Sequence, residues 1–389
     1  MKVLIYSEYF FPVTGGVQTI VFELACGLAE STKNNASRDP VDVTVVTRTA
    51  GRTVEEERWP FRLVRRPSLV KLIRLIGDAD VIHLAGPALL PMALGLALGK
   101  PVVVEHHGYQ SVCPNGLLLI GASEAVTGCP GHFMARRYNL CLACNSKDMG
   151  WSGSLRALTL QFPRRWLCRL VSSNVAVTDH VARRIALPRT RTILHGIRDP
   201  GFQRPCCNGK TIRIGYVGRL VREKGLSLLL KAGKRLKDDG FTFQIIFVGE
   251  GPLRKELERE SNELGLAERV TFTGELFGAD LEKAVRRLQV LVMPSLWEET
   301  AGLAAIEQMM RGGVVIASDI GGLSEIVGDA GLKFAPGDAE ALYLRLRKMF
   351  EDPSIAASLP SSARERAELI FNRDTMIQKH VSVYQEVAR

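Results

Sequence analysis

Apolar runs typical of buried strands alternate with amphipathic helical segments along the whole chain. The first run is KVLIYS, residues 2–7, and apolar residues then follow at helical spacing, namely Val17, Ile20, Val21, Leu24 and Leu28. The pairing recurs in VDVTVVT, DVIHLAG and PVVVEHH, and later in TIRIGYVGRL, TFQIIFVGEG and VLVMPS. Continuously apolar strands separated by helices are typical of parallel sheets covered on both faces. The sequence therefore predicts an α/β fold of two Rossmann-like, doubly wound domains.

The chain has 389 residues, which is enough for two domains. Pro and Gly interrupt the periodicity in RDPGFQRPCCNGK, residues 198–210, which we expect to be the linker. The predicted domains are residues 1–200 and residues 208–370, followed by a terminal helix in residues 371–389. Doubly wound domains bind ligands at the carboxyl ends of their strands, so a cleft faced by two such edges is the default ligand site.

Composition excludes several classes of protein. The chain has no apolar run of roughly 18 residues, so we expect no transmembrane helix. Glu8 interrupts the apolar start too early for a signal peptide, and eight cysteines are too few for a disulfide scaffold. We therefore expect a cytoplasmic protein whose mature form starts at Met1.

The positive charge lies mainly in the first half. Residues 1–200 hold 24 basic and 15 acidic side chains, whereas residues 201–389 hold 27 and 26. RALTLQFPRRWLCRLV, residues 156–171, places arginines beside aromatic residues, and a second basic cluster comprises Arg62, Arg65, Arg66, Lys71 and Arg74. Such segments suit an anionic membrane surface, although solvated helix faces explain them equally well. We expect peripheral contact with the inner face of the membrane and, without a nucleic-acid motif, no nucleic-acid partner.

The motif with the most chemical content is MPSLWEETAGLAAIEQMMRGGVVIASDIGGLSEIV, residues 293–327. A strand ends near Ser295, a loop with two glutamates follows, and a helix is expected from Gly302. The free backbone amides of Gly302 and Leu303 would form an anion site at the start of that helix. Glu307 lies about 7 Å further along it, within reach of a ribose diol, with Glu299 on the sugar side of the phosphates. A helix-capping pair plus a surface charge remains the alternative interpretation of the two glutamates.

Two cations follow another predicted strand. GYVGRLVREKG, residues 215–225, places Arg219 and Lys224 on a glycine-containing turn. Cations at the carboxyl edge of a sheet can stabilise a departing pyrophosphate. The strands in FVGEGPL and FTGEL also end in glycine, where a base or ribose could approach the backbone.

These residues resemble retaining glycosyltransferase family 4, whose members have the GT-B fold. The resemblance covers nearly the whole chain, and its most specific element is the E-x7-E spacing of Glu299 and Glu307. In the family, the residue matching Glu307 binds the ribose hydroxyls and the one matching Glu299 contacts the donor sugar. The residues matching Arg219 and Lys224 bind the diphosphate.

The resemblance extends to the N-terminal half. Gly15 and Gly16, in PVTGGVQ, match a glycine loop that closes over the donor phosphates. His107 matches a histidine near the donor sugar that is important for transfer, and Glu275 falls where family members contact the base. The terminal helix, residues 371–389, resembles the segment that crosses back to the first domain.

The resemblance implies an enzyme that moves a hexose from a UDP- or GDP-sugar to a saccharide or lipid-linked acceptor, with retention and without a required metal. Cell-surface polysaccharide or glycolipid synthesis is the implied setting. Ala301 replaces an aromatic residue of the family and His195 replaces an asparagine, which we interpret as a structural substitution. The alternatives are a sugar-nucleotide epimerase, a phosphorylase, for which no pyridoxal phosphate signature is present, or a non-catalytic relative.

Other motifs give weaker signals. Asp78-Ala79-Asp80 fits a metal-binding D-x-D pattern, but it precedes a predicted strand, so we interpret it as a helix-to-strand turn. Gly15-Gly16-Val17 lacks the spacing of a dinucleotide fingerprint. No nucleophile elbow or phosphate-binding P-loop is present.

Four cysteines cluster in the first half: Cys113, Cys129, Cys141 and Cys144. The last two form a C-x2-C pair, and the spacing could close a tetrahedral structural zinc site on a long loop. Unligated thiols and disulfides are the alternatives. The other cysteines are expected to be inert, including Cys206 and Cys207 in the linker.

Overall fold

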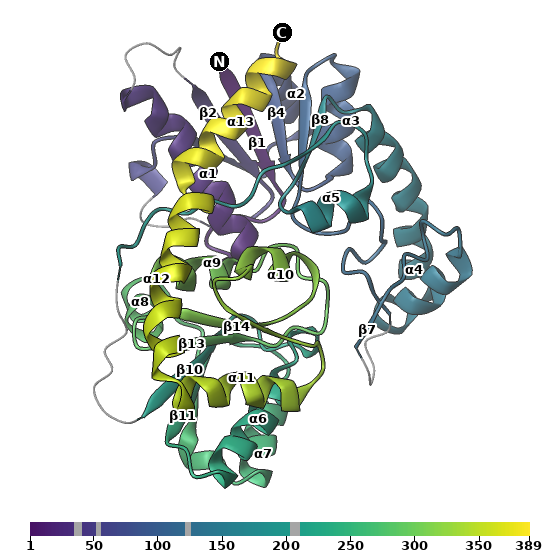
Figure 1. Ribbon diagram of the computed structural model, residues 1–389. Coiled ribbons are helices and arrows are strands. Elements are labelled where there is room, and N and C mark those ends of the chain that lie inside the picture. The colour runs from purple at the N-terminus through teal and green to yellow at the C-terminus, as the bar shows by residue number, and fades with distance from the viewer. Residues whose placement is uncertain (35–40, 52–55, 121–125, 203–210) are drawn as a thin grey trace. The chain divides into compact units, whose positions relative to one another are not determined.

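The computed structural model describes residues 1–34, 41–51, 56–120, 126–202 and 211–389. The chain divides into two units, each built around its own parallel sheet (Figure 1). The N-terminal unit comprises Met1–Ser123, Cys129–Arg198 and Asn372–Arg389, and the C-terminal unit comprises Glu124–Gly128 and Asp199–Phe371. The linker cysteines Cys206 and Cys207 lie outside the described residues.

The sheet of the N-terminal unit has seven parallel strands in the order β3-β2-β1-β4-β5-β8-β9. Its strands are β1 (Lys2–Ser7), β2 (Asp42–Thr47), β3 (Arg62–Arg65), β4 (Val81–Ala85), β5 (Val102–His106), β8 (Ser173–Ala176) and β9 (Thr190–Thr192). The helices between them are α1 (Gly16–Asn34), η1 (Glu56–Arg58), α2 (Leu69–Asp78), α3 (Leu89–Ala97), α4 (Tyr138–Leu170) and α5 (Asp179–Ile185). Two short strands, β6 (Leu119–Ile120) and β7 (Thr127–Gly128), form a separate small sheet.

The last helix, α13 (Arg373–Val387), belongs to the N-terminal unit although it comes from the far end of the chain. It packs against α1, where Ile377 fills the space beside Gly27. Arg373 forms ion pairs with Glu23 and Glu30 of α1 at 3.4 and 2.7 Å. Charged and apolar contacts together therefore hold α13 on this unit.

The sheet of the C-terminal unit has six parallel strands in the order β12-β11-β10-β13-β14-β15. These are β10 (Ile212–Val217), β11 (Phe243–Val248), β12 (Val270–Gly274), β13 (Val290–Met293), β14 (Val314–Ser318) and β15 (Leu332–Phe334). The helices are η2 (Arg222–Lys224), α6 (Leu226–Asp238), α7 (Arg254–Glu263), η3 (Ala267–Arg269), α8 (Gly278–Val285), α9 (Leu303–Met310), α10 (Gly321–Val327), α11 (Ala339–Glu351) and α12 (Pro353–Ile370).

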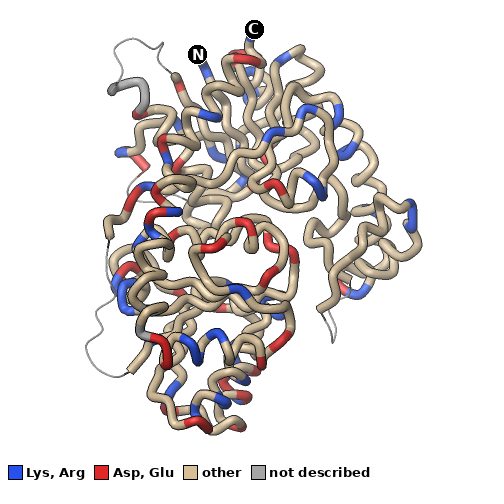
Figure 2. The backbone as a smooth tube through the Cα atoms, in the orientation of Figure 1, with Lys and Arg blue, Asp and Glu red and all other residues tan. Residues whose placement is uncertain are grey.

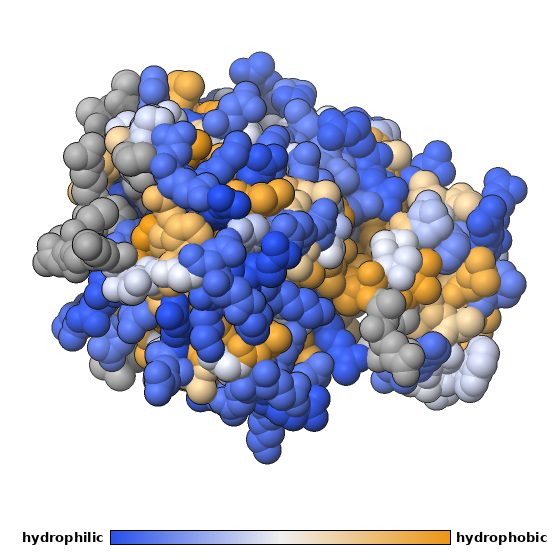
Figure 3. All heavy atoms as spheres, turned by 60° about the horizontal axis from the view of Figure 1, so that its bottom comes forward, coloured by the Kyte–Doolittle hydropathy of each residue, from blue (hydrophilic) through white to orange (hydrophobic). Residues whose placement is uncertain are grey.

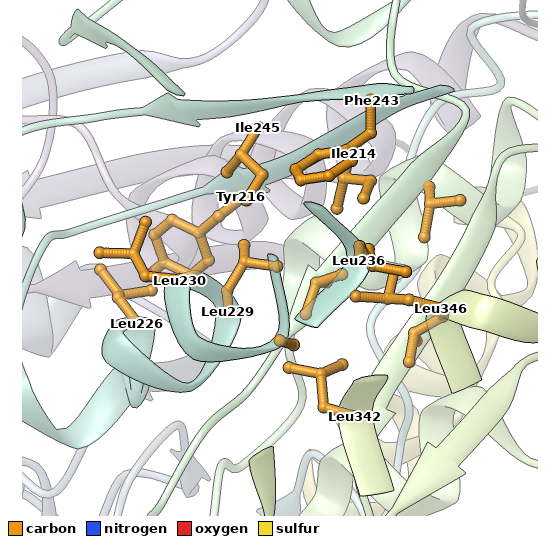
Figure 4. Packing of buried hydrophobic residues seen from close by; sticks show 14 of the residues in the cluster. Ile214, Tyr216, Leu226, Leu229, Leu230, Leu236, Phe243, Ile245, Leu342 and Leu346 are labelled. Atoms are coloured by element: carbon orange, nitrogen blue, oxygen red, sulfur yellow. The ribbon is translucent and has the colours of Figure 1, made fainter. Parts of the chain in front are cut away.

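The core of the C-terminal unit is apolar. Leucines of α6 and α11 pack on the β-branched and aromatic residues of β10, β11 and β13, as Figure 4 shows for Leu229, Ile245 and Leu346. Strands buried on both faces explain why their sequences are continuously apolar. The predicted α/β architecture with two doubly wound sheets is confirmed.

The D-x-D motif lies where its position before a strand predicts. Asp78 is the last residue of α2, and the carboxylate of Asp80 accepts a hydrogen bond from the backbone N–H of Lys2 at 2.7 Å. This pair of aspartates therefore forms the helix-to-strand turn that joins α2 to β4.

Candidate functional site

Glu299 lies in the loop that follows β13, at the carboxyl edge of the C-terminal sheet. The residue is 5% exposed, and Lys224 Nζ donates to its Oε1 at 2.6 Å. The Ser295 hydroxyl donates to the same oxygen. A buried carboxylate needs such partners because losing its hydration is costly. The two predicted donor-site residues Lys224 and Glu299 thus form one ion pair.

Gly225 allows the loops after β10 and β13 to pack against each other. Its φ is +64°, and a Cβ there would lie 2.1 Å from the carbonyl oxygen of Pro294. The backbone N–H of Leu296 donates to the Glu223 carbonyl at 2.8 Å and fixes the approach. A larger residue at 225 would separate the loops and move Lys224 away from Glu299.

The helix α9 begins beside this ion pair. Gly302 precedes it with φ +73°, a left-handed conformation in which glycine is favoured. The amides of Gly302 and Leu303 have no acceptor within the helix, because the first four N–H groups of any helix lack one. The Glu299 carbonyl accepts from Gly322 N–H at 2.6 Å, which ties the loop to the start of α10. Amides without an acceptor in the helix and the helix dipole together favour an anion here.

The other predicted donor-site residues of this unit follow strands of the same sheet. Arg219 comes after β10 with its side chain 72% exposed, 3.9 Å from Glu223. The hydroxyl of the buried Tyr216 donates to the Arg219 carbonyl at 2.9 Å and holds the turn. Glu275 is exposed directly after β12, and Glu307 is half-buried one turn into α9. Parallel strands place all of these positions at one edge of the sheet.

In the N-terminal unit, Gly15 and Gly16 lie after β1 and His107 lies after β5. The carbonyl of Gly15 accepts from the backbone N–H and the hydroxyl of Thr19 at 3.0 and 3.1 Å, so the two exposed glycines form the start of α1. The neighbouring strands β1, β4 and β5 are parallel, so the glycine loop after β1 and His107 after β5 lie at the same carboxyl edge of the sheet.

A buried carboxylate, Glu105, organises the residues around His107. Glu105 is fully buried, and its Oε2 lies 3.3 Å from His107 Nε2 and 3.1 Å from His83 Nε2. The hydroxyl of Tyr384, on α13, lies 2.9 Å from His83 Nδ1. Hydrogen bonds therefore connect the last helix of the chain through His83 to Glu105, whose carboxylate lies beside His107.

Two more histidines complete this group. His195 Nε2 lies 3.3 Å from His107 Nδ1, and burial lowers the pKa of His195 to about 3. His380 Nδ1 donates to the Met376 carbonyl at 2.9 Å, its Nε2 lies 3.8 Å from Glu105 Oε1, and burial lowers the pKa of His380 to about 4. Burial by itself raises the pKa of Glu105, but the histidines around it outweigh that effect and hold the pKa well below its usual range.

Within the described part of the chain, two groups have ligand atoms that all lie within 4.8 Å of one another: His83–Glu105–His380 and Glu105–His107–His195. Both groups share the buried carboxylate. The four cysteines predicted as zinc ligands lie after β5 and in the first two turns of α4, and all four are free thiols.

Sequence reasoning missed most of the Glu105 group. It assigned His107 but not Glu105, His83 or His380. It interpreted His195 as a structural substitution, and the ring of His195 lies against that of His107. One signal was available, because Glu105 is an ionisable residue inside the otherwise apolar run VVVEHH. The sequence has no comparable feature at His83 of β4 or at His380 of α13.

Two arginines of the basic segments are bound to backbone carbonyls. Arg65 donates to the carbonyls of Thr49 and Phe11, and Arg165 donates to those of Ile185 and Ala186. The other basic residues of these segments are mostly exposed, namely Arg62, Arg66, Lys71, Arg74, Arg156 and Arg169. Basic residues are spread over several elements in Figure 2. Trp151 and Trp166 of α4 are 69% and 60% exposed, and Figure 3 shows apolar side chains on the surface of the lobe that contains α4. Among the described helices, none has an apolar stretch that could span a bilayer.

Solved structures share this fold. Anabaena HepE, in complex with UDP and glucose, matches with a TM-score of 0.72 and 19% identity over 99% of this chain and 100% of that chain. Sucrose-phosphate synthase from Thermosynechococcus elongatus matches with a TM-score of 0.71 and 21% identity, over 99% and 98%. At these identities the likeness shows the fold, which is GT-B.

The amino-acid sequence matches two family models, which show the family of this chain. Residues 14–198 match the model "Glycosyltransferase Family 4" and residues 202–367 match "Glycosyl transferases group 1". The chain is 36% identical over 154 residues to a 2-deoxystreptamine glucosyltransferase of Streptomyces kanamyceticus and 35% identical over 328 residues to the sulfoquinovosyl transferase SQD2 of Arabidopsis thaliana. The matches cover 39% and 80% of this chain but only 40% and 58% of those relatives. The protein belongs to the family 4 glycosyltransferases.

Proposed function

We propose that the protein transfers a hexose from a UDP- or GDP-sugar to a saccharide or lipid-linked acceptor, with retention at the anomeric carbon. The observation that carries this proposal is the Lys224–Glu299 ion pair beside the open amides of α9. Membership of the family supports it, as do the UDP and glucose bound by HepE. Polysaccharide or glycolipid assembly is the proposed setting.

The donor diphosphate would bind at the carboxyl edge of the C-terminal sheet. The amides of Gly302 and Leu303 would receive phosphate oxygens, with Arg219 and Lys224 supplying positive charge. Lys224 has three N–H donors, so it can keep its bond to Glu299 while it also contacts a phosphate. Glu307 would hold both ribose hydroxyls, and Glu275 would contact the base.

In the reaction, the bond between the anomeric carbon and the diphosphate oxygen breaks while the acceptor hydroxyl attacks from the same face. The acceptor's proton passes to the departing phosphate oxygen, so no covalent enzyme intermediate is needed. The cations stabilise the growing charge of the diphosphate in place of a metal ion. Glu299 and His107 would steady the oxocarbenium-like sugar, and Gly15 and Gly16 would close over the phosphates.

The test begins with the wild-type protein and a panel of UDP-, GDP- and ADP-sugars in the presence of EDTA. We expect slow release of nucleotide from one donor without acceptor and faster release with it. Glu299→Gln should lower the rate ~10²–10³-fold while nucleotide affinity stays within a few-fold. Glu298→Gln is the matched control, because it makes the same chemical change one residue away, and it should retain most of the activity.

Several outcomes would contradict the proposal. Full activity in Glu299→Gln would exclude the assigned role, and unchanged nucleotide affinity in Glu307→Ala would exclude the ribose contact. Loss of activity with EDTA that Mg²⁺ restores would show that the two cations do not replace a metal. Conversion of the donor into its epimer would replace transfer with epimerisation, and failure to bind any nucleotide would indicate a non-catalytic relative.

We also propose that the protein works at the inner, anionic face of the membrane, where a lipid-linked acceptor would be found. The exposed tryptophans of α4 support this, because indole rings partition into the membrane interface. Trp151→Ala combined with Trp166→Ala should weaken sedimentation with vesicles of anionic lipid, whereas Phe277→Ala, an exposed aromatic of the other unit, should not. Equal sedimentation of all three proteins would exclude α4 as the contact.

A further inference from the structure

The segment between β5 and α4 brings four thiols into one region of the N-terminal unit. Cys113 and Cys129 lie within the segment, and Cys141 and Cys144 lie one helical turn apart at the start of α4. Cys113, Cys129 and Cys141 are 5–8% exposed, and Cys144 is half-buried. Buried thiols from separate stretches of chain are the usual source of ligands for a structural metal.

Two of the cysteines occupy similar turns. The sequences are Cys113-Pro-Asn-Gly116 and Cys129-Pro-Gly-His132, and the glycines at 116 and 131 have φ of +75° and +93°. His132 N–H points at Cys129 Sγ from 3.5 Å. The backbone amides of Leu118, Asn115 and Gly116 donate to the sulfur of Cys113. A sulfur faced by several amides is suited to become a metal-bound thiolate.

Hydrogen bonds show how closely the three stretches approach. Cys113 Sγ donates to Asn115 Oδ1 at 2.9 Å, and Asn115 Nδ2 lies 3.9 Å from Cys144 Sγ. The backbone N–H of Cys129 donates to the Leu118 carbonyl at 2.7 Å, and Cys144 Sγ donates to the next carbonyl, that of Leu119, at 3.2 Å. One asparagine and two consecutive carbonyls therefore contact three of the four cysteines.

Cys141 completes the group. Its sulfur interacts electrostatically with those of Cys113, Cys129 and Cys144. The described residues contain two groups of ligand atoms that all lie within 4.8 Å of one another, and the four sulfurs are not among them. Two of them instead bond as thiols to Asn115 and Leu119. Zinc binding would therefore require these thiols to lose their protons and the four sulfurs to come together around the ion, because metal affinity is coupled to proton release.

We propose that Cys113, Cys129, Cys141 and Cys144 bind one zinc ion as four thiolates in a structural site. Four S–H groups release four protons to solvent, four Zn–S bonds form, and no atom is oxidised or reduced. With sulfur in all four positions, none is left open for a substrate. Arg184, which donates to the Cys129 carbonyl at 3.0 Å, places a positive charge beside the anionic centre. The ion would clamp the segment that follows His107 to the first turn of α4.

Metal content of the full-length protein, purified under reducing conditions with zinc in the medium, tests this site. We expect one zinc per chain, and titration with a mercurial reagent should release it as four thiols react. Cys141→Ser should lower the zinc content at least tenfold. Cys168→Ser is the matched control, because Cys168 is also a buried free thiol and lies outside the cluster.

Other results of these experiments would contradict the zinc site. Wild-type protein that remains free of zinc after incubation with one equivalent would overturn the proposal, as would iron with acid-labile sulfide, or disulfides among these cysteines. Equal loss of zinc in Cys168→Ser would show that the metal is not held by this cluster. If Cys141→Ser does not fold, the mercurial titration of the wild type decides, since release must accompany reaction of four thiols. Cobalt substitution gives a third readout, and absence of a thiolate charge-transfer band would exclude sulfur ligation.

Discussion

In the N-terminal unit the carboxylate at the end of β5, Glu105, is surrounded by histidines, whereas in the C-terminal unit the carboxylate after β13, Glu299, meets a lysine. Glu105 is fully buried inside the sheet layer, and Glu299 is 5% exposed at its edge. A lysine carries its charge at every physiological pH, whereas burial lowers the pKa of His380, beside Glu105, to about 4. The two units therefore support their central carboxylates by different physical means: a charged lysine in one, and buried histidines that acid would protonate in the other.

The difference also concerns distance along the chain. Lys224, Ser295 and Glu299 lie on two loops of one sheet edge, and each loop follows its own strand. The Glu105 group takes its members from β4, β5, the stretch before residue 200 and α13. Support for Glu105 therefore depends on the docking of α13, whereas support for Glu299 depends on the local packing of two loops.

Removing the buried carboxylate should have the largest effect on stability. Glu105→Ala leaves a cavity and removes the carboxylate that contacts His83 and His107, and we expect a loss of ~3–5 kcal/mol in the free energy of unfolding. Glu386→Ala is the control, because this residue forms an exposed ion pair with Arg191 in the same unit and should cost ~0–1 kcal/mol. Urea denaturation measures both, and equal losses would contradict the importance of burial.

Acidification should destabilise the N-terminal unit next most strongly. Burial lowers the pKa of His106 to about 4, below the 6.5 of an unfolded histidine, so the unfolded chain binds more protons between these values. Stability should be full above pH 6.5 and should fall by about 1.4 kcal/mol per pH unit for this histidine as pH drops toward 4. His380 and His195 act in the same direction. Urea denaturation at pH 7 and pH 5 checks this, and His106→Gln should have a smaller pH dependence.

Breaking the ion pair of the C-terminal unit should cost less. Lys224→Met leaves Glu299 with the Ser295 hydroxyl as a remaining donor, so we expect a loss of ~1–3 kcal/mol. This loss should be nearly independent of pH between 6 and 8, because the charge of lysine does not change there. Thermal unfolding at several pH values measures it, and a strong pH dependence in this range would remove the contrast between the two units.

The smallest effect should come from the glycine at the start of α9. Gly302→Ala places a Cβ 2.8 Å from Leu323 Cδ1 at a positive φ, whereas Gly240→Ala has a similar φ of +80° with open space around it. Both should lose ~1 kcal/mol from backbone strain, and Gly302→Ala somewhat more. Calorimetry should detect weaker nucleotide binding in Gly302→Ala alone, and equal binding by both variants would argue against the anion site.

The alternating pattern of this chain was enough to predict two parallel sheets, because strands buried on both faces must be continuously apolar. It also placed Arg219, Lys224, Glu299 and Gly302 at the ends of strands, since residues that follow parallel strands share one edge. Roles in binding and transfer stay predictions for these residues. The exact partner of Lys224 was not predictable, because the sequence does not state which neighbouring loop a side chain faces.

By itself, the sequence determined the class of fold, the order of strands and helices, and the positions of the motifs, because local periodicity and turn residues are encoded in neighbouring positions. Only the tertiary structure decided that Glu105 shares its site with His83, His195 and His380, and that Tyr384 reaches it from the last helix. These contacts join residues up to 301 positions apart in the chain. The partners of a buried charge are the residues that the fold brings close to it. The spacing of residues along the sequence does not show which residues these are.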